Sequence, residues 1–199
     1  EWRHGVHVVR GTGSTLDPSR FTGRAANYLT YFASAVLKGQ GVRRPDVVVA
    51  LTDPPIIGLA ALAAAARARA PFVFLCEDIF PEVAVLLEDF RSGIVNDALT
   101  QVNRFLVRKA ARIVALGDTM KRRLVEGKGA DPSKVTVIHN WTDCSAMTPG
   151  PRDNAFARQH GLVDRFVVLH AGNIGLSQNL EIILHAAELG ASLTEYKVT

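Results

Sequence analysis

The chain has 199 residues, of which 48% are hydrophobic and 21% charged, so it has an ordinary globular composition and can bury a sizeable core as one domain or slightly more. Its longest apolar run, residues 56–66, is shorter than the roughly 20 residues that cross a bilayer, so no membrane-spanning helix is expected. The net charge of +4 suits an anionic partner without identifying one.

Short apolar runs alternate with segments of helical periodicity along most of the chain. The runs typical of strands are residues 6–9, 47–51, 72–76, 113–116, 135–139 and 166–170. Because these runs are continuous rather than alternating, we expect both faces of the strands to be buried, as in a parallel sheet between helices. The predicted fold class is therefore α/β, with a Rossmann-like parallel sheet.

The stretch DCSAMTPGPR, residues 143–152, interrupts this pattern with two prolines and a glycine and is typical of a linker. We therefore expect two parts: residues 1–147, an incomplete N-terminal Rossmann-like domain, and residues 148–199, the start of a second domain. In the second part, the run 166–170 leads into a loop with Gly172 and Gly175 and then into an amphipathic helix. This order predicts the first βα unit of a nucleotide-binding domain.

Polar residues follow the predicted strands at the edge where doubly wound folds bind ligands. Glu77 and Asp78 come directly after the run 72–76, and Asn140 follows the run 135–139. Two adjacent carboxylates at a strand end can bind sugar hydroxyls or assist proton transfer. Capping a helix or forming an ion pair is about as good an interpretation of Glu77 and Asp78.

Basic residues gather in two neighbouring helical segments. They are Arg104, Arg108, Lys109, Arg112, Lys121, Arg122 and Arg123. A solvated helical face is the plainer interpretation, and an anionic membrane surface contacted by Arg104, Arg108, Lys109 and Arg122 is the alternative. The segments lack the alternation of basic and aromatic residues that base stacking requires, so nucleic acid is not an expected partner.

The cysteines and histidines give no metal-binding pattern. Cys76 and Cys144 are far apart and are interpreted as free thiols of a reducing cytoplasm. His139 and His170 end predicted strands, but packing or a surface hydrogen bond is favoured for every histidine because no second ligand is near in sequence. No metal and no cofactor are expected. Without an export signal before the first predicted strand, the expected location is cytoplasmic, or peripheral on the inner face of the cell membrane.

Five stretches of the chain carry a resemblance to a known family. In order they read PDVVVALTDPP, FLCEDIFPE, AARIVALGDTMKRRL, KVTVIHNWTD and VVLHAGNIGLSQNLEIILHAA. Their succession resembles the family 4 glycosyltransferases of the GT-B fold, and within them the bacterial branch that builds cell-surface polysaccharides, similar to colanic-acid and O-antigen fucosamine transferases. The resemblance extends from about Arg24 to Gly190.

The resemblance implies a retaining transfer of a hexose or amino sugar from a nucleotide-sugar donor to a lipid-linked or glycan acceptor, without a catalytic metal. It implies that residues 1–147 lie on the acceptor side and residues 148–199 begin the donor-binding domain. Glu77 and Asp78 are then the candidate catalytic residues. The candidate donor-binding residues are Gly172, Asn173, Ile174, Gly175, Gln178 and Asn140.

The glycine loop fits a donor diphosphate because small residues allow the backbone to approach it and a helix N-terminus favours negative charge. The alternative is a tight turn that only packs a helix on a strand. Many members of the family carry an Arg and a Lys where this chain has Asn173 and Gln178. The family's glutamate pair for the donor ribose and its first glycine-rich loop are not found, so we expect an internal piece that is inactive alone.

Two other functions are left open by the residues. One is a nucleotide-sugar epimerase, which shares the GT-B architecture, and the other is a nucleotide-binding module without catalysis.

Overall fold

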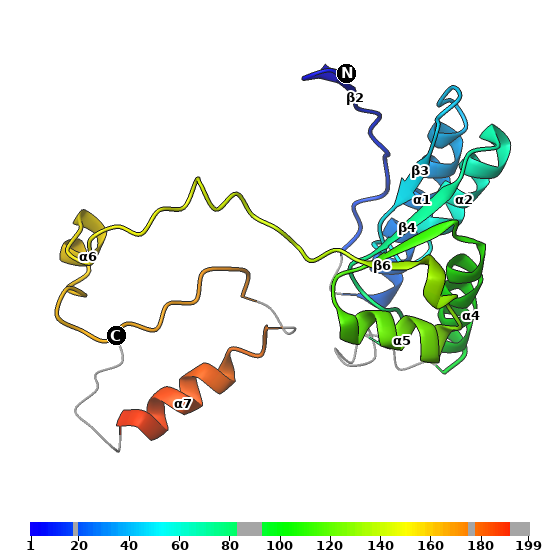
Figure 1. The fold of residues 1–199 in the computed structure, drawn as a ribbon. Coiled ribbons are helices and arrows are strands. Elements are labelled where there is room, and N and C mark those ends of the chain that lie inside the picture. Colours follow the sequence, from blue (N-terminus) through cyan, green and yellow to red (C-terminus); the bar gives the residue numbers. More distant parts are fainter. Residues whose placement is uncertain (18–19, 83–92, 175–177, 192–199) are drawn as a thin grey trace. The chain divides into compact units, whose positions relative to one another are not determined.

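The computed structural model describes residues 1–17, 20–82, 93–174 and 178–191 (Figure 1). The chain forms two compact units, Glu1–Asn140 and Trp141–Thr199. The assignment of residues 1–147 to an acceptor-side domain and of residues 148–199 to a donor-side domain stays a prediction.

A four-stranded parallel sheet forms the centre of the first unit. Its strands are β3 (Val48–Ala50), β4 (Phe72–Cys76), β5 (Arg112–Ala115) and β6 (Val135–Val137), and they lie side by side in this order. Each was predicted as a strand, and β4 has the predicted bounds. The α/β class with a parallel sheet is confirmed.

Three helices connect these strands and pack on the sheet, α2 (Ile57–Ala68), α4 (Gly93–Lys109) and α5 (Asp118–Lys128). Before β3 the chain forms α1 (Phe21–Gly39), which packs against α2, and the short 3-10 helix η1 (Pro132–Lys134) precedes β6. Gly58 allows α2 to approach α4, because a Cβ at this position would lie 2.7 Å from the Cδ1 atom of Leu106. Gly129, with a φ of 75°, adopts the left-handed conformation that ends α5.

The hydrophobic core lies on one face of the sheet. Ala50, Phe74, Ile113 and Val135 are aligned across the four strands, and all are buried. They pack with buried side chains of α4 and α5, including Leu106. Since α2, α4 and α5 each connect a strand to its next neighbour in the sheet, right-handed crossovers place all three helices on this face.

The opposite face of the sheet is less well covered. Val49 on β3 is 53% exposed, and its neighbour across the strands, Val73, is only partly buried. Arg112 and Thr136, which lie on the same face, are exposed. The expectation that both faces are buried is therefore wrong for the described residues, because their helices cover one face only.

The first predicted strand, residues 6–9, lies outside the parallel sheet. Its residues Val6–His7 form β2, which pairs antiparallel with β1 (Trp2–Arg3). His4 and Gly5, both at positive φ, form the two-residue turn between them. Such a turn pairs neighbouring strands locally, which explains why this run forms a hairpin rather than a strand of the sheet.

The second unit contains two helices among its described residues, α6 (Ala155–Gln159) and α7 (Glu181–Ala191). The predicted strand at residues 166–170 is not formed, and Phe166 and Leu169 are 79% and 72% exposed. A strand needs a hydrogen-bonded neighbour, and no other strand occurs in the part of this unit that the structure describes. The helical half of the predicted βα unit is present as α7.

Candidate functional site

Polar residues that follow β3 and β4 meet at the carboxyl edge of the sheet. Ala50 of β3 pairs with Phe74 of β4, so the residues that follow the two strands emerge at the same edge. We name Thr52, Asp53, Glu77 and Asp78 the carboxylate edge. The side chain of Thr52 is buried, and its Oγ1 accepts a hydrogen bond of 3.2 Å from the backbone N–H of Asp78. This bond ties the two strand ends together.

Asp53 is a partly buried carboxyl of this edge. Partial burial, and secondly the negative charge of Asp78, raise the pKa of its carboxyl above the ordinary value. Sequence reasoning did not select Asp53 as a site residue. The signal that could have found it is its place directly after the run 47–51, at the same edge as Glu77 and Asp78.

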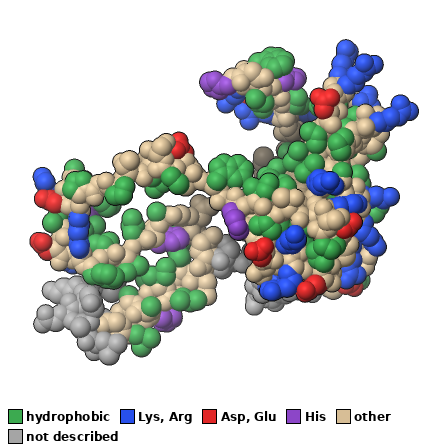
Figure 2. Space-filling model, viewed as in Figure 1, with side chains coloured by type: hydrophobic (Ala, Val, Ile, Leu, Met, Phe, Trp, Pro, Cys, Tyr) green, Lys and Arg blue, Asp and Glu red, His purple; other side chains and the backbone are tan. Residues whose placement is uncertain are grey.

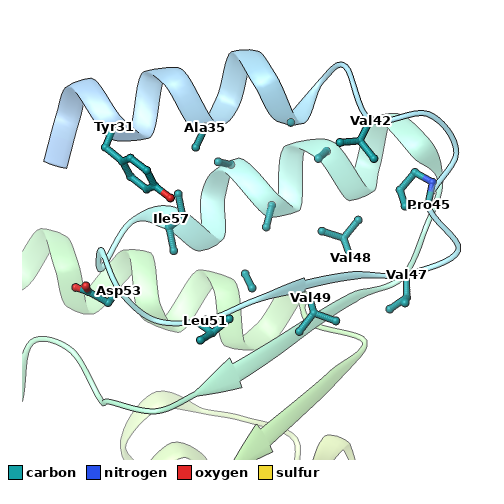
Figure 3. Close-up of a pocket in the computed structure, with 15 residues that line it drawn as sticks. Tyr31, Ala35, Val42, Pro45, Val47, Val48, Val49, Leu51, Asp53 and Ile57 are labelled. Atoms are coloured by element: carbon teal, nitrogen blue, oxygen red, sulfur yellow. The ribbon is translucent and has the colours of Figure 1, made fainter. Parts of the chain in front are cut away.

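Beside Asp53 an apolar groove runs between α1, α2 and β3 (Figure 3). It has a volume of about 530 Å³. Tyr31 and Ala35 line it from α1, and Ile57 lines it from α2. Asp53 stands at the end of the groove where β3 ends, so a carboxylate lies next to a mostly apolar wall.

Lys128 of α5 binds the segment that follows Asp78. The Nζ atom of Lys128 donates to the carbonyl oxygen of Phe80 at 3.0 Å and lies 2.7 and 2.8 Å from the two carboxylate oxygens of Glu82. The side chain of Lys128 is 3% exposed, whereas that of Glu82 is 46% exposed. Neither residue was predicted from the sequence as part of a site.

The ends of β5 and β6 are joined by a histidine. Nδ1 of His139 lies 2.9 Å from the carbonyl oxygen of Leu116, within hydrogen-bonding distance. This contact is of the kind favoured for His139 from the sequence, a surface hydrogen bond rather than a catalytic role. Asn140, which follows it and was predicted to bind donor, is exposed at the end of the first unit.

The predicted donor loop belongs to the second unit. Gly172, Asn173, Ile174 and Gln178 are described, whereas Gly175 lies outside the described residues. A Cβ at Gly172 would meet only the ring of His170, at 3.5 and 3.6 Å, which is ordinary contact. Gly172 is also not among the residues at positive φ, so its backbone would accept a side chain without strain.

The predicted basic surface is exposed on α4 and α5. Arg104, Arg108 and Lys109 come from α4 and Arg122 from α5, and the two helices pack together. Figure 2 shows basic side chains gathered over the first unit, with acidic ones among them. Nζ of Lys109 lies 5.9 Å from the centre of the Phe105 ring, a cation–π contact at the surface.

In the described ranges, no helix has both the length and the apolar character needed to cross a membrane. The same ranges hold no group of three or more His, Cys, Asp or Glu side chains arranged to bind a metal ion.

Comparisons with known proteins match most of the chain. Residues 1–141 match the model of the family described as glycosyl transferase 4-like domain. A probable glycosyltransferase of Pseudomonas aeruginosa, WbjE, is 30% identical over 152 residues, which cover 74% of this chain and 37% of that protein. A D-inositol 3-phosphate glycosyltransferase of Mycobacterium tuberculosis is 33% identical over 82 residues, covering 41% of this chain and 17% of that protein.

Among solved structures, the chain is similar to Alr3699/HepE of Anabaena. The complex of that protein with UDP-glucose gives a TM-score of 0.57 at 20% identity, over 83% of this chain and 41% of that chain. Its complex with UDP and glucose gives 0.60 at 20% identity, over 84% and 41%. At this identity the likeness shows the fold alone. The chain spans less than half the length of these relatives.

The raised pKa of Asp53 predicts a pH-dependent stability difference. Folding favours the protonated carboxyl, so its contribution to stability is complete below the ordinary pKa of 3.8 and is lost as pH rises through the folded pKa. We expect Asp53→Asn, which cannot titrate, to gain stability relative to wild type from about pH 4 to about pH 7. Urea unfolding followed by circular dichroism at both pH values measures this difference.

Asp131→Asn is the control, because we expect its stability relative to wild type to change with pH in the opposite direction. Hydrogen bonds from the Ser133 side chain and backbone N–H lower the pKa of Asp131, so its stabilising contribution is present above the ordinary pKa of 3.8 and lost on acidification. We expect this variant to be less stable than wild type at neutral pH and to approach it in acid. Parallel pH trends for Asp53→Asn and wild type would contradict the assignment at Asp53.

Proposed function

The chain belongs to the glycosyl transferase 4-like family and has a fold of the GT-B type, and we propose that the protein containing it transfers a sugar from a nucleotide-sugar donor to a lipid-linked or glycan acceptor. The observation that carries this proposal is the family match over residues 1–141, which includes the whole carboxylate edge. The proposed reaction retains the anomeric configuration, uses no metal and contributes to cell-surface polysaccharide synthesis in the cytoplasm.

The carboxylate edge is proposed as the acceptor side of the reaction. A hydroxyl that attacks a sugar must lose a proton, and a carboxylate that accepts its hydrogen bond assists that loss. Glu77 and Asp78 follow β4 directly, and Glu77 is exposed, so an acceptor can reach this edge from solvent. Asp53 adds a third carboxyl to this edge, and partial burial and the charge of Asp78 raise its pKa above that of an ordinary aspartate.

The loop of residues 172–175, together with Gln178 and Asn140, is proposed to bind the donor. The relative Alr3699/HepE binds UDP-glucose and UDP in its crystal structures, which supports a nucleoside diphosphate sugar as donor. Ala171 and Gly172 are small, so backbone N–H groups can approach phosphate oxygens, and α7 follows the loop. Asn173 and Gln178 offer hydrogen bonds without charge.

A transfer assay with full-length protein tests the proposed function. We expect release of the nucleotide only when a lipid-linked acceptor is added to the nucleotide-sugar, and no transfer by residues 1–199 alone, because a GT-B site needs two domains. Conversion of the donor sugar into its epimer without acceptor would indicate an epimerase instead. Binding of the donor with neither reaction would indicate a module without catalysis.

Gly172→Val should weaken donor binding by about 10-fold to 100-fold, the equivalent of roughly 1.5–3 kcal/mol for a lost hydrogen bond to a charged group. The structure leaves room for a side chain at Gly172, so this effect would not come from a clash in the loop itself. Calorimetry on full-length protein measures it. Gly190→Val is the control, because nothing lies within 4 Å of a Cβ there.

Equal donor affinity of wild type and Gly172→Val would make the loop a structural turn only. Asn173→Arg gives the opposite test at the same loop. A guanidinium there should tighten donor binding, because charge-assisted hydrogen bonds to phosphate are stronger than neutral ones.

The basic surface on α4 and α5 is proposed to rest on anionic lipid. Reversing the charges of Arg108, Lys109 and Arg122 should weaken binding to anionic vesicles by about 1 kcal/mol per residue. Vesicle sedimentation at two salt concentrations measures this effect. Reversal at Arg67, which is exposed on α2 outside the cluster, is the control. Binding that does not respond to the triple reversal or to salt would exclude this surface.

A further inference from the structure

Lys128 is a buried cation that the proposed chemistry does not use. It is the last residue of α5, and the left-handed Gly129 ends the helix directly after it. Only 3% of its side chain is exposed. Lysine is almost never fully buried unless its charge is paired. Here the ammonium group makes three contacts, two with the carboxylate oxygens of Glu82 and one with the carbonyl oxygen of Phe80. This lysine is therefore held in one place.

The partners of Lys128 belong to the turn that begins at the carboxylate edge. We name residues 78–82 the acidic turn. At its start, the backbone N–H of Asp78 donates to the buried hydroxyl of Thr52 at 3.2 Å. At its end, the ammonium of Lys128 binds Phe80 and Glu82. Between the two anchors, Ile79 and Pro81 are buried, so the whole turn is fixed against the body of the unit.

Stability alone gives a weak reason for this arrangement. Taking an ammonium group out of water carries a desolvation penalty of several kcal/mol that an ion pair does not always recover. Glu82 is 46% exposed, so water also competes for its charge. A buried charge in such a position is better explained by the geometry that it specifies, and the geometry here is that of the turn carrying Asp78.

We propose that Lys128 is a positioning residue that anchors the acidic turn and thereby holds the carboxylates of Glu77 and Asp78 where the acceptor binds. This inference rests on the proposed transferase function. It concerns the acceptor side only, because Lys128 and its partners all belong to the first unit. Loss of the anchor should therefore affect the rate of transfer without changing donor affinity.

Lys128→Met tests the inference in full-length protein, since methionine fills the buried space of the lysine stem without its charge. We expect backbone amide exchange in the acidic turn to accelerate by about tenfold or more. In the transfer assay, kcat should fall by about tenfold or more while the donor KM stays within about twofold of wild type. Lys128→Arg, which keeps the charge, should recover part of both effects.

The matched control is Lys134→Met. Lys134 lies in η1, and no hydrogen bond joins its side chain to the acidic turn among the described residues.

Unchanged amide exchange in the acidic turn of Lys128→Met, or an unchanged kcat, would overturn the inference. If the wild-type protein transfers no sugar, the proposed function fails, and the exchange measurement alone decides whether Lys128 anchors the turn. If Lys128→Met does not fold, Glu82→Gln at the half-exposed partner should give smaller changes in the same direction, and their absence overturns the inference.

Discussion

Parallel strands persist only where each has a hydrogen-bonded neighbour, and this requirement decides which apolar runs of the chain become strands. The runs that form β3 to β6 are neighbours in both sequence and space, so each helical crossover delivers the next strand to its partner. The same alignment brings every strand end to one edge. The hydrogen bond between Asp78 and Thr52 exists because β3 and β4 end side by side. The candidate site is thus a consequence of strand pairing.

Local sequence patterns predicted which segments of the chain can form strands. Phe72–Cys76 was predicted with its observed bounds because five apolar residues bounded by Pro71 and Glu77 leave little ambiguity. Residues 6–9 and 166–170 are also mostly apolar, yet the first pairs in a hairpin and the second has no strand beside it in the described part of its unit. Periodicity describes a segment and carries no information about its neighbour. For the same reason it could not show that Val49 lies on the less covered face.

The site was predictable to a similar extent. Glu77 and Asp78 follow a strand directly, so their edge could be predicted from the sequence. The contact of Lys128 with this part of the chain could not be predicted, because Lys128 is 46 positions away from Glu82 and only folding brings the two residues together.

The two thiols differ in a way that has a practical consequence. Cys76 is fully buried at the end of β4, and desolvation raises the pKa of its thiol to about 12. Because the thiolate is the reactive form, maleimides and iodoacetamides have almost nothing to attack there at neutral pH. Cys144 is exposed in the segment that opens the second unit. The unaltered chain thus carries a single accessible attachment point for a fluorophore or spin label, at the junction of its two units.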